Sequence, residues 1–335
     1  MRNRNALWAL MAMVLLILDS RCAVRSAREA LELCSRTLIP SLFPLFVLSS
    51  LSVPGLLGVR IPALARLLGL PQGAEGLFLL GCAGGFPMGA SAIAQCVRSG
   101  SLGKKDAQRM LGLCSCCGPA FLFGAGPRFL PMERVAALFV LQLETALLLG
   151  SLWPGDSEGT LRPQQEDISL PEAVRRAVRS MTSVCAWVVL AGVAAGSLRR
   201  WLFPLLPRAL SLLLTGLLEL TTGVFALEPG TDRSFLLCAV FVCFGGLSVL
   251  LQIGGVAQGL SMKQCMLQKM LHGLLGFAAA WAYLCFGPMF LLLIPGLLFL
   301  KSCKLNNLVL IVKTLRRQLQ TLPPGGKLSP PPGGD

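Results

Sequence analysis

Eight apolar runs of roughly membrane-spanning length decide what this chain can fold into. They lie at residues 6–18, 37–53, 77–97, 135–153, 181–198, 209–227, 234–257 and 270–300. About 20 apolar residues in a helix cross the hydrocarbon core of a bilayer. Only 14% of the 335 residues are charged, compared with about 25% in soluble domains. We therefore predict an all-α, polytopic protein of the cell membrane, with about 8 to 10 transmembrane or re-entrant helices.

The basic residues fit a membrane protein better than a nucleic-acid-binding one. The formal net charge is +14, but the arginines and lysines lie in short connections between apolar runs, the pattern of cytoplasmic loops. The first run follows Arg2 and Arg4 and resembles a signal peptide. It ends at residues 19–22 without a small-x-small cleavage site, so we expect an uncleaved first helix. We expect lipid contact and no nucleic-acid partner.

A polar and turn-rich stretch, PGDSEGTLRPQQEDIS, divides the chain into two halves. Pro and Gly dominate the last residues, a composition that cannot form a core. The predicted organisation is an N-terminal transmembrane helix (1–20), a first half (21–153), a polar linker (154–170), a second half (171–300), a basic segment (301–317) and a disordered tail (318–335).

The two halves resemble each other in the order of their features. Each opens with a basic amphipathic stretch, later has Gly-Gly inside an apolar run, and then has a basic connection. The matching segments are 21–36 with 172–179, 84–85 with 245–246, and 104–112 with 263–273. The last two pairs are offset by about 160 residues. Such repeats, often inverted, build transporters whose site lies where discontinuous helices of both halves meet. We expect an inverted repeat.

Glycine and proline interrupt the run that contains GCAGGFPMGASAIAQC, residues 81–96. They cost roughly 1 and 3 kcal/mol in a helix interior. Small residues also serve close helix packing, but Pro87 favours a broken helix, because packing needs Gly and not Pro. Broken helices are tolerated in membranes where the freed backbone groups line a cavity or pack within protein. A second break at Gly118-Pro119 predicts a re-entrant hairpin or half-helix whose tip faces Gly84–Pro87.

Ionisable residues inside apolar runs need a reason, since each costs about 2.5–3.5 kcal/mol on insertion scales. Glu219 has two interpretations. Either it lies at a helix break, where it orients a solute, binds a coupling cation or carries a proton, or it pairs with a basic residue such as Arg208 or Lys269. For Glu144 we favour structural pairing. His272, the only histidine, is expected at a helix end near the headgroup interface.

The remaining polar and cysteine residues point to binding rather than catalysis. Ser248 and Gln252 share a helix face beside Gly245-Gly246, where they contact solute or hydrogen-bond between helices. Most of the 13 cysteines lie in apolar runs, where Cys acts as a small hydrophobe. The cluster 114–117 has no nearby His or acid to complete a zinc site. Because no Ser/His/Asp set, HExxH, P-loop or GxGxxG occurs, we expect neither an enzyme nor a cofactor.

Several blocks together resemble one family. TLIPSLFPLFVLSSL, LFLLGCAGGFPMGA, CSCCGPAFLFGAGP, GLLELTTG and CFGGLSVLLQ are similar, in consistent order, to sporulation integral membrane proteins that carry nucleoside-transporter-like Gate domains. The resemblance covers roughly residues 30–300. It implies two Gate-type halves in the membrane surrounding the forespore, and movement of a small solute, with dipicolinate the leading candidate. Where the family tends to have Cys-Asn-Asn-Ser/Pro, this chain has CSCCGP at 114–119, which removes two amide donors.

The sequence therefore predicts a transporter or facilitator of a small polar, anionic or heteroaromatic solute. Without a Walker motif, transport is downhill, driven by a partner, or coupled to an ion or proton gradient. The alternatives are a non-transporting scaffold that recruits partners during spore assembly and a nucleoside permease. The predicted solute site comprises Gly84, Gly85, Phe86, Pro87, Gly89, Ser91, Ser115, Cys116, Gly118, Pro119, Glu219, Thr221, Thr222, Gly245, Gly246, Ser248 and Gln252.

Overall fold

A computed structural model of the chain describes residues 2–57, 59–152, 161, 168–292, 294–296 and 298. These residues form helices and no β-strand, which confirms the all-α prediction for the described part of the chain. The predicted basic segment (301–317) and disordered tail (318–335) lie outside the described residues. So does most of the predicted linker (154–170).

The chain begins with a separate helix and then a long one built from two segments. α1 (Arg2–Leu18) is followed by α2 (Ser20–Leu33), which runs through a π-helical turn (Cys34–Leu38) into α3 (Ile39–Leu57). The remaining elements are shorter, except the last. They are α4 (Pro62–Leu68), α5 (Glu75–Gly84), α6 (Met88–Arg98), α7 (Lys104–Leu113), α8 (Pro119–Ala125), a 3₁₀ turn (Gly126–Arg128) and α9 (Met132–Leu152).

The second half begins with one long helix, α10 (Leu170–Trp201), which a 3₁₀ turn (Phe203–Leu205) separates from the next helices. These are α11 (Arg208–Leu218), α12 (Leu220–Phe225), α13 (Asp232–Phe244), α14 (Gly246–Val256), α15 (Met262–Phe286) and a 3₁₀ segment (Gly287–Leu292). The helix-like basic connection predicted at 263–273 is helical, and it forms the first half of α15 without a break before the apolar run that follows. An unbroken run of good helix formers follows Ser261, which caps α15 by accepting a hydrogen bond from the Gln264 N–H.

Five helices of the described chain are long and apolar enough to cross a membrane. They are Ser20–Ser52, Met132–Leu152, Leu170–Trp201, Asp232–Val256 and Met262–Leu292. The predicted number of about 8 to 10 included shorter, re-entrant helices as well as full spans. Two of the predicted runs, 77–97 and 209–227, are each split into two arms by a break, so none of these arms has the length of a span.

One face of α15 exposes a row of large apolar side chains: Met266, Met270, Leu274, Phe277 and Trp281. Their spacing of three or four residues places them on a single side of the helix. A contiguous apolar face of this kind is unfavourable in water and favourable against lipid. The exposed surface therefore agrees with the membrane location predicted from the apolar runs.

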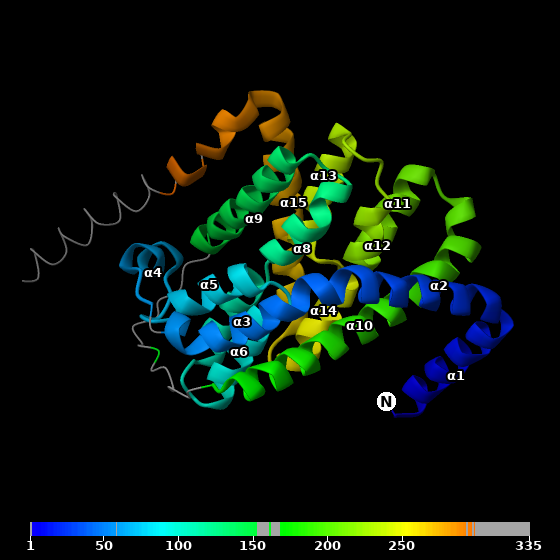
Figure 1. Cartoon of the computed structure of the whole chain (residues 1–335), viewed down its shortest axis with the longest axis horizontal. Helices are drawn as coiled ribbons and strands as arrows, with labels where there is room; N and C mark the ends of the chain where they lie inside the picture. The colour runs from blue at the N-terminus through cyan, green and yellow to red at the C-terminus, as the bar shows by residue number, and fades with distance from the viewer. Residues whose placement is uncertain are drawn as a thin grey trace, which may run out of the picture.

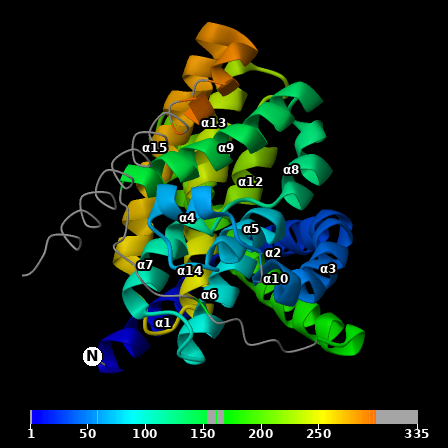
Figure 2. The ribbon, with the colours of Figure 1, turned by 90° about the vertical axis from the view of Figure 1, so that its left-hand side faces the viewer.

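Two long antiparallel rods organise the molecule. Figure 1 shows α2 and α3 running across it beside α10, against which both pack. Asp19, just before α2, pairs with Arg200 near the end of α10, with 2.8 Å between Oδ1 and Nη1. Helices α9, α13 and α15 pack against one another on one side of this pair, as Figure 2 shows.

Candidate functional site

The first broken helix folds back on itself. α5 ends at Gly84 and α6 begins at Met88. A Cβ on Gly89 of α6 would lie 2.9 Å from the Cα of Gly81 in α5. In a straight helix, residues eight positions apart are separated by about 12 Å. The chain therefore reverses, and α5, α6 and the turn between them form what we call the first hairpin. The carbonyl oxygen of Cys114 lies against both glycines, so neither position has room for a side chain.

The tip of the first hairpin touches the second predicted break. Residues 114–118 form an irregular link between α7 and α8, and Pro119 begins α8. Gly85, at φ +69°, lies so close that a Cβ there would be 2.6 Å from the Gly118 nitrogen. The predicted break at Gly118-Pro119 and its contact with the Gly84–Pro87 tip are confirmed.

A second hairpin of the same kind contains Glu219. This residue is extended, at φ −143° and ψ 112°, between α11 and α12. A Cβ on Gly223 would collide with the Cα of Gly216, so the two arms cross at a pair of glycines. The Glu219 carboxylate accepts hydrogen bonds from the N–H groups of Thr221 (3.0 Å) and Thr222 (2.5 Å), as an N-cap. We call α11, α12 and Glu219 the second hairpin.

The predicted helix break at Glu219 is confirmed, and its alternative, pairing with a base, is wrong. Arg208 pairs instead with Glu228, at 3.6 Å between Nη2 and Oε1. Lys269 donates to the carbonyl of Ser115. Backbone N–H groups at the start of α12 compensate the negative charge of the carboxylate, because a helix N-terminus carries partial positive charge.

The tips of both hairpins border one small cavity, the central cavity, of about 60 Å³. Gln252 of α14 lines one side of the cavity and is only 4% exposed. Its side-chain amide has no hydrogen bond to any of the described residues. The other walls are apolar side chains of α3, α8 and α10. The predicted site residues that line it are Gly84, Gly85, Phe86, Gly118, Glu219, Thr221 and Gln252.

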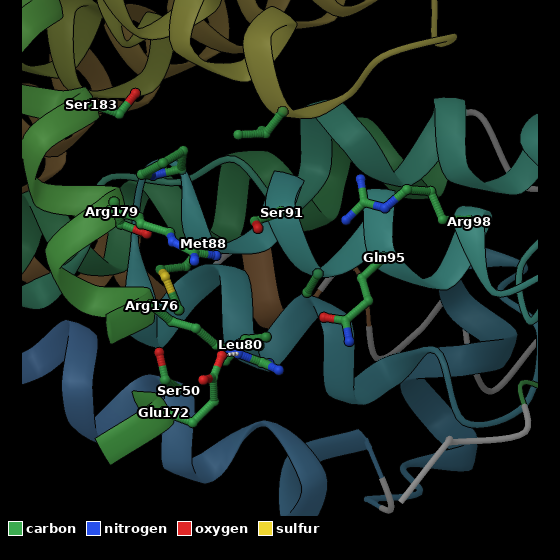
Figure 3. Close-up of a pocket in the computed structure, with 14 residues that line it drawn as sticks. Ser50, Leu80, Met88, Ser91, Gln95, Arg98, Glu172, Arg176, Arg179 and Ser183 are labelled. Carbon is green, nitrogen blue, oxygen red and sulfur yellow. Dashed lines mark hydrogen bonds and ion pairs between the residues drawn. The ribbon is translucent and has the colours of Figure 1, made fainter. Parts of the chain in front are cut away.

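A larger, open cavity of about 460 Å³ adjoins the first hairpin, and we call it the α6 vestibule. Pro87 and Ser91 of the predicted site lie in its wall. Figure 3 shows Ser91, Gln95 and Arg98 on one side of it, facing the start of α10. From α10 come Glu172, Arg176, Arg179, Ser180 and Ser183. Glu172 and Arg176 form an ion pair, so the wall has more positive than negative charge.

A third cavity, of about 490 Å³, adjoins the second hairpin, and we call it the α12 vestibule. Thr222 of the predicted site lies in its wall, together with residues of α2 and the end of α10. Three arginines and two glutamates line it: Arg36, Arg128, Arg199, Glu29 and Glu32. Arg128 donates to the Thr37 hydroxyl at 3.1 Å, which fixes its guanidinium at the inner end.

The three cavities follow one another along the two antiparallel rods. On α10, residues 172–183 line the α6 vestibule, Val184 and Val188 the central cavity, and residues 192–199 the α12 vestibule. On α2–α3 the order is reversed. Each hairpin tip stands between the central cavity and one vestibule, since Gly84–Phe86 lines the centre and Pro87 the α6 side. In the second hairpin, Glu219 lines the central cavity and Thr222 lines the α12 vestibule.

Seven predicted site residues line none of these three cavities: Gly89, Ser115, Cys116, Pro119, Gly245, Gly246 and Ser248. Of these, Gly89 and Gly245 serve close packing against neighbouring elements. Ser248 is buried beside the break with its hydroxyl unpartnered. The predicted break at Gly245-Gly246 is confirmed, at φ +91° and +81°. Its glycines shape the wall rather than line the space.

His272 lies in the interior, at 1% exposure, so its predicted place at a headgroup interface is wrong. Its Nε2 lies 3.0 Å from the Gln142 carbonyl oxygen and 3.1 Å from the Thr145 hydroxyl of α9. No sequence pattern near His272 indicates this contact, because the partners are 130 and 127 residues away.

Glu144 has no structural partner among the described residues, so its predicted pairing is also wrong. Both of its carboxylate oxygens are buried without a hydrogen bond, although the residue is only 4% exposed. Gln142, two residues earlier, points to a different helix face and exchanges hydrogen bonds with the backbone of Cys117, at 2.7 and 3.2 Å. Gln142 thus holds the irregular link beside the first hairpin.

Comparisons with protein-family models, with curated proteins and with solved structures found no match to this chain.

Proposed function

We propose that the protein is a multi-pass membrane transporter or facilitator of a small polar solute, anionic or heteroaromatic. The observation that carries this proposal is the row of cavities: a small central cavity of about 60 Å³ between two vestibules of about 460 and 490 Å³, with a hairpin tip at each boundary. A transporter needs a site that opens to one side at a time. Movement of either hairpin would join the central cavity to its own vestibule while the other hairpin stays closed.

The size of the central cavity supports hairpin movement as a step of the cycle. Its volume of about 60 Å³ is a small fraction of the volumes of the two vestibules, about 460 and 490 Å³. A dicarboxylate or a nucleoside would therefore enter it with movement of a hairpin tip. Gly84, Gly85 and Gly118 present backbone rather than side chains at this point, which lets a solute approach the freed backbone groups.

An inverted repeat is part of the proposal, and the order of elements supports it with a new offset. α3, the first hairpin, the broken pair α7–α8 and α9 correspond in order to α10, the second hairpin, α13–α14 and α15. α9 and α15 begin at Met132 and Met262, an offset of about 130 rather than 160 residues. Packing follows the same scheme, since α3 contacts α8 as α10 contacts α14. The antiparallel course of α2–α3 and α10 fits halves of opposite orientation.

An anionic solute is favoured by the arginines of both vestibules. Arg98, Arg176 and Arg179 line one, and three further arginines line the other. Both vestibules also contain glutamate, but each has more arginines than glutamates. An excess of one sign of charge in a cleft raises the local concentration of the opposite ion. The resemblance to sporulation membrane proteins makes dipicolinate the first solute to test and the membrane around the forespore the proposed location. Coupling to an ion or a proton, or downhill flow, is compatible with the absence of a Walker motif.

Uptake by reconstituted vesicles tests the proposed function. We expect vesicles containing the protein to take up radiolabelled dipicolinate faster than protein-free vesicles. Gln252→Ala should reduce the initial rate about fivefold to tenfold, because its amide is an unpartnered polar group at the cavity wall, worth about 1 to 1.5 kcal/mol. Gln264→Ala, which changes an exposed glutamine of α15, is the matched control and should leave uptake unchanged.

Two outcomes would point to the alternatives. Uptake of nucleosides but not of dipicolinate would favour a nucleoside permease with the same site. No uptake of either solute, despite verified insertion, would count against transport and favour a scaffold for spore assembly. In that case Gln252→Ala would also leave the phenotype of the cells unchanged.

The basic charge of the α6 vestibule should act on apparent affinity. Arg98→Glu combined with Arg179→Glu is expected to raise the KM for an anionic solute several-fold, with little change in the maximal rate, because steering acts on encounter. The effect should shrink in high salt, since screening shortens the range of exposed charges to about 3 Å at 1 M. Lys104→Glu with Lys105→Glu, exposed and outside this cavity, is the control of equal charge. Equal effects of both pairs would refute a specific role of the vestibule.

A further inference from the structure

Lys269 places an ammonium group in the interior of the protein. The residue lies on α15 and is 0% exposed. Its Nζ donates to the carbonyl oxygen of Ser115 at 2.6 Å and lies 3.3 Å from Nδ1 of His272. The face of the Phe86 ring is the third neighbour, with its centroid 5.2 Å away. A buried charge needs compensation of this kind, because an isolated ammonium is very costly to remove from water.

The imidazole accepts a hydrogen bond from Lys269 rather than donating one. Nε2 of His272 faces the Gln142 carbonyl, which can only accept, so Nε2 carries the hydrogen. The Thr145 hydroxyl uses its own hydrogen for the Leu141 carbonyl, at 2.7 Å, and is free to accept as well. Nδ1 therefore has its lone pair directed at Lys269. The hydrogen-bond partners therefore make Nδ1 of His272 the acceptor and Nζ of Lys269 the donor.

The same set of neighbours is what a small cation binds. Ser115 belongs to the irregular link 114–118, so its carbonyl is not used within a helix. This link begins at the C-terminal end of α7, which carries partial negative charge. Freed carbonyls and half-helix C-termini coordinate the coupling cations of transporters, and an aromatic face attracts cations too. No carboxylate of the described residues pairs with Lys269, and the other titratable groups around it are the thiols of Cys116, Cys117, Cys243 and Cys265.

We propose that Lys269 is a tethered cation: its ammonium permanently occupies a monovalent-cation site at the broken helices, and no free metal ion binds there. Phe86 connects this site to the solute, because the ring that faces the ammonium also lines the central cavity. Provided that the proposed transport function holds, solute movement then depends on no sodium ion at this position. The cation site itself stands on geometry and is tested without any solute.

Thermal melting of the purified full-length protein in detergent tests the proposal. The wild type is expected to melt at the same temperature in sodium chloride as in choline chloride of equal ionic strength. In choline chloride, Lys269→Ala should melt at a lower temperature than the wild type, because the Ser115 carbonyl and the Phe86 face lose their cation. Methylammonium or sodium should restore about half of the fall or more, with a rise that grows with cation concentration, as for any ligand of the folded state.

Two variants control for volume and for general effects of charge. Lys269→Met fills the same space without a charge, so it should melt lower than the wild type and gain nothing from methylammonium. Lys263→Ala, an exposed lysine on the same helix, should behave as the wild type. If Lys269→Ala yields no folded protein, Lys269→Arg replaces it, and this variant should fold and ignore sodium.

Three results would overturn the proposal. The first is a sodium-dependent rise of melting temperature in the wild type or in Lys269→Arg. The second is a Lys269→Ala protein whose melting no cation raises. The third is an equal response of Lys269→Met and Lys269→Ala to methylammonium. Failure of the uptake experiment above, with the expected melting behaviour, would leave the cation site in place and remove only its link to transport.

Discussion

Gly85→Ala is expected to lower the stability of the protein by about 2 to 6 kcal/mol. Two costs add up. At φ +69° and ψ −166°, Gly85 occupies a backbone region that is essentially restricted to glycine, with a penalty of about 1 to 3 kcal/mol for other residues. The added Cβ would also lie 2.6 Å from the backbone nitrogen of Gly118, and overpacking of this kind costs about 1 to 3 kcal/mol. Because both partners are backbone, no side chain can move aside.

The chain contains a matched control for this prediction. Gly287, after α15, has nearly the same conformation, at φ +71° and ψ −166°, with no atom within 4 Å of the position of a Cβ. Gly287→Ala therefore carries the backbone penalty without the collision. Melting of both variants in detergent separates the two costs. Equal melting temperatures would show that the hairpin tip does not press against the Gly118 link.

The glycine and proline pattern was enough to predict the helix breaks. Gly85 and Gly245 have positive φ, and Pro119 begins a helix, three conformations that only these residue types favour. The contact between the Gly84–Pro87 tip and Gly118 was also predictable, because breaks in two neighbouring helices are expected to lie beside each other. Local chemistry determined these features, and local chemistry is what a single sequence displays.

Features that depend on distant partners were predicted poorly. One of the two alternatives for Glu219 was pairing with a distant base, Arg208 or Lys269. Its carboxylate instead uses the nearby N–H groups of Thr221 and Thr222, at the helix break that was the other alternative. His272 and Lys269 were placed by their position in a basic segment. Their burial follows from the packing of α15 on α7 and α9, which no pattern within 263–273 specifies.

The offset of the proposed repeat shows how a motif can mislead. Gly-Gly at 84–85 and at 245–246 suggested equivalence, but the first pair is in a hairpin turn and the second joins α13 to α14. By element order, the partner of the first turn is Glu219, which is not a glycine. An extended residue with a capping side chain and a glycine turn can both reverse a chain, so equivalent turns need not share residues.

Glu219→Gln should reduce the initial rate of solute uptake by roughly 10-fold to 150-fold, with little loss of the protein from the membrane. Both carboxylate oxygens accept a backbone N–H, and a glutamine keeps one acceptor while turning an NH₂ group toward the other N–H. A hydrogen bond to a charged group is worth about 1.5 to 3 kcal/mol, which sets the expected range. The tip of the second hairpin then loses its fixed turn at the wall of the central cavity.

Glu228→Gln provides the same chemical change away from the cavity. The Glu228 side chain is 73% exposed and pairs with Arg208, itself 92% exposed, an arrangement that contributes about 0 to 1 kcal/mol. Uptake by Glu228→Gln should equal that of the wild type at equal protein per vesicle. Melting temperatures of both variants complete the experiment. Loss of uptake by Glu219→Gln at an unchanged melting temperature assigns Glu219 to hairpin movement, whereas unchanged uptake would reduce its role to closing a turn.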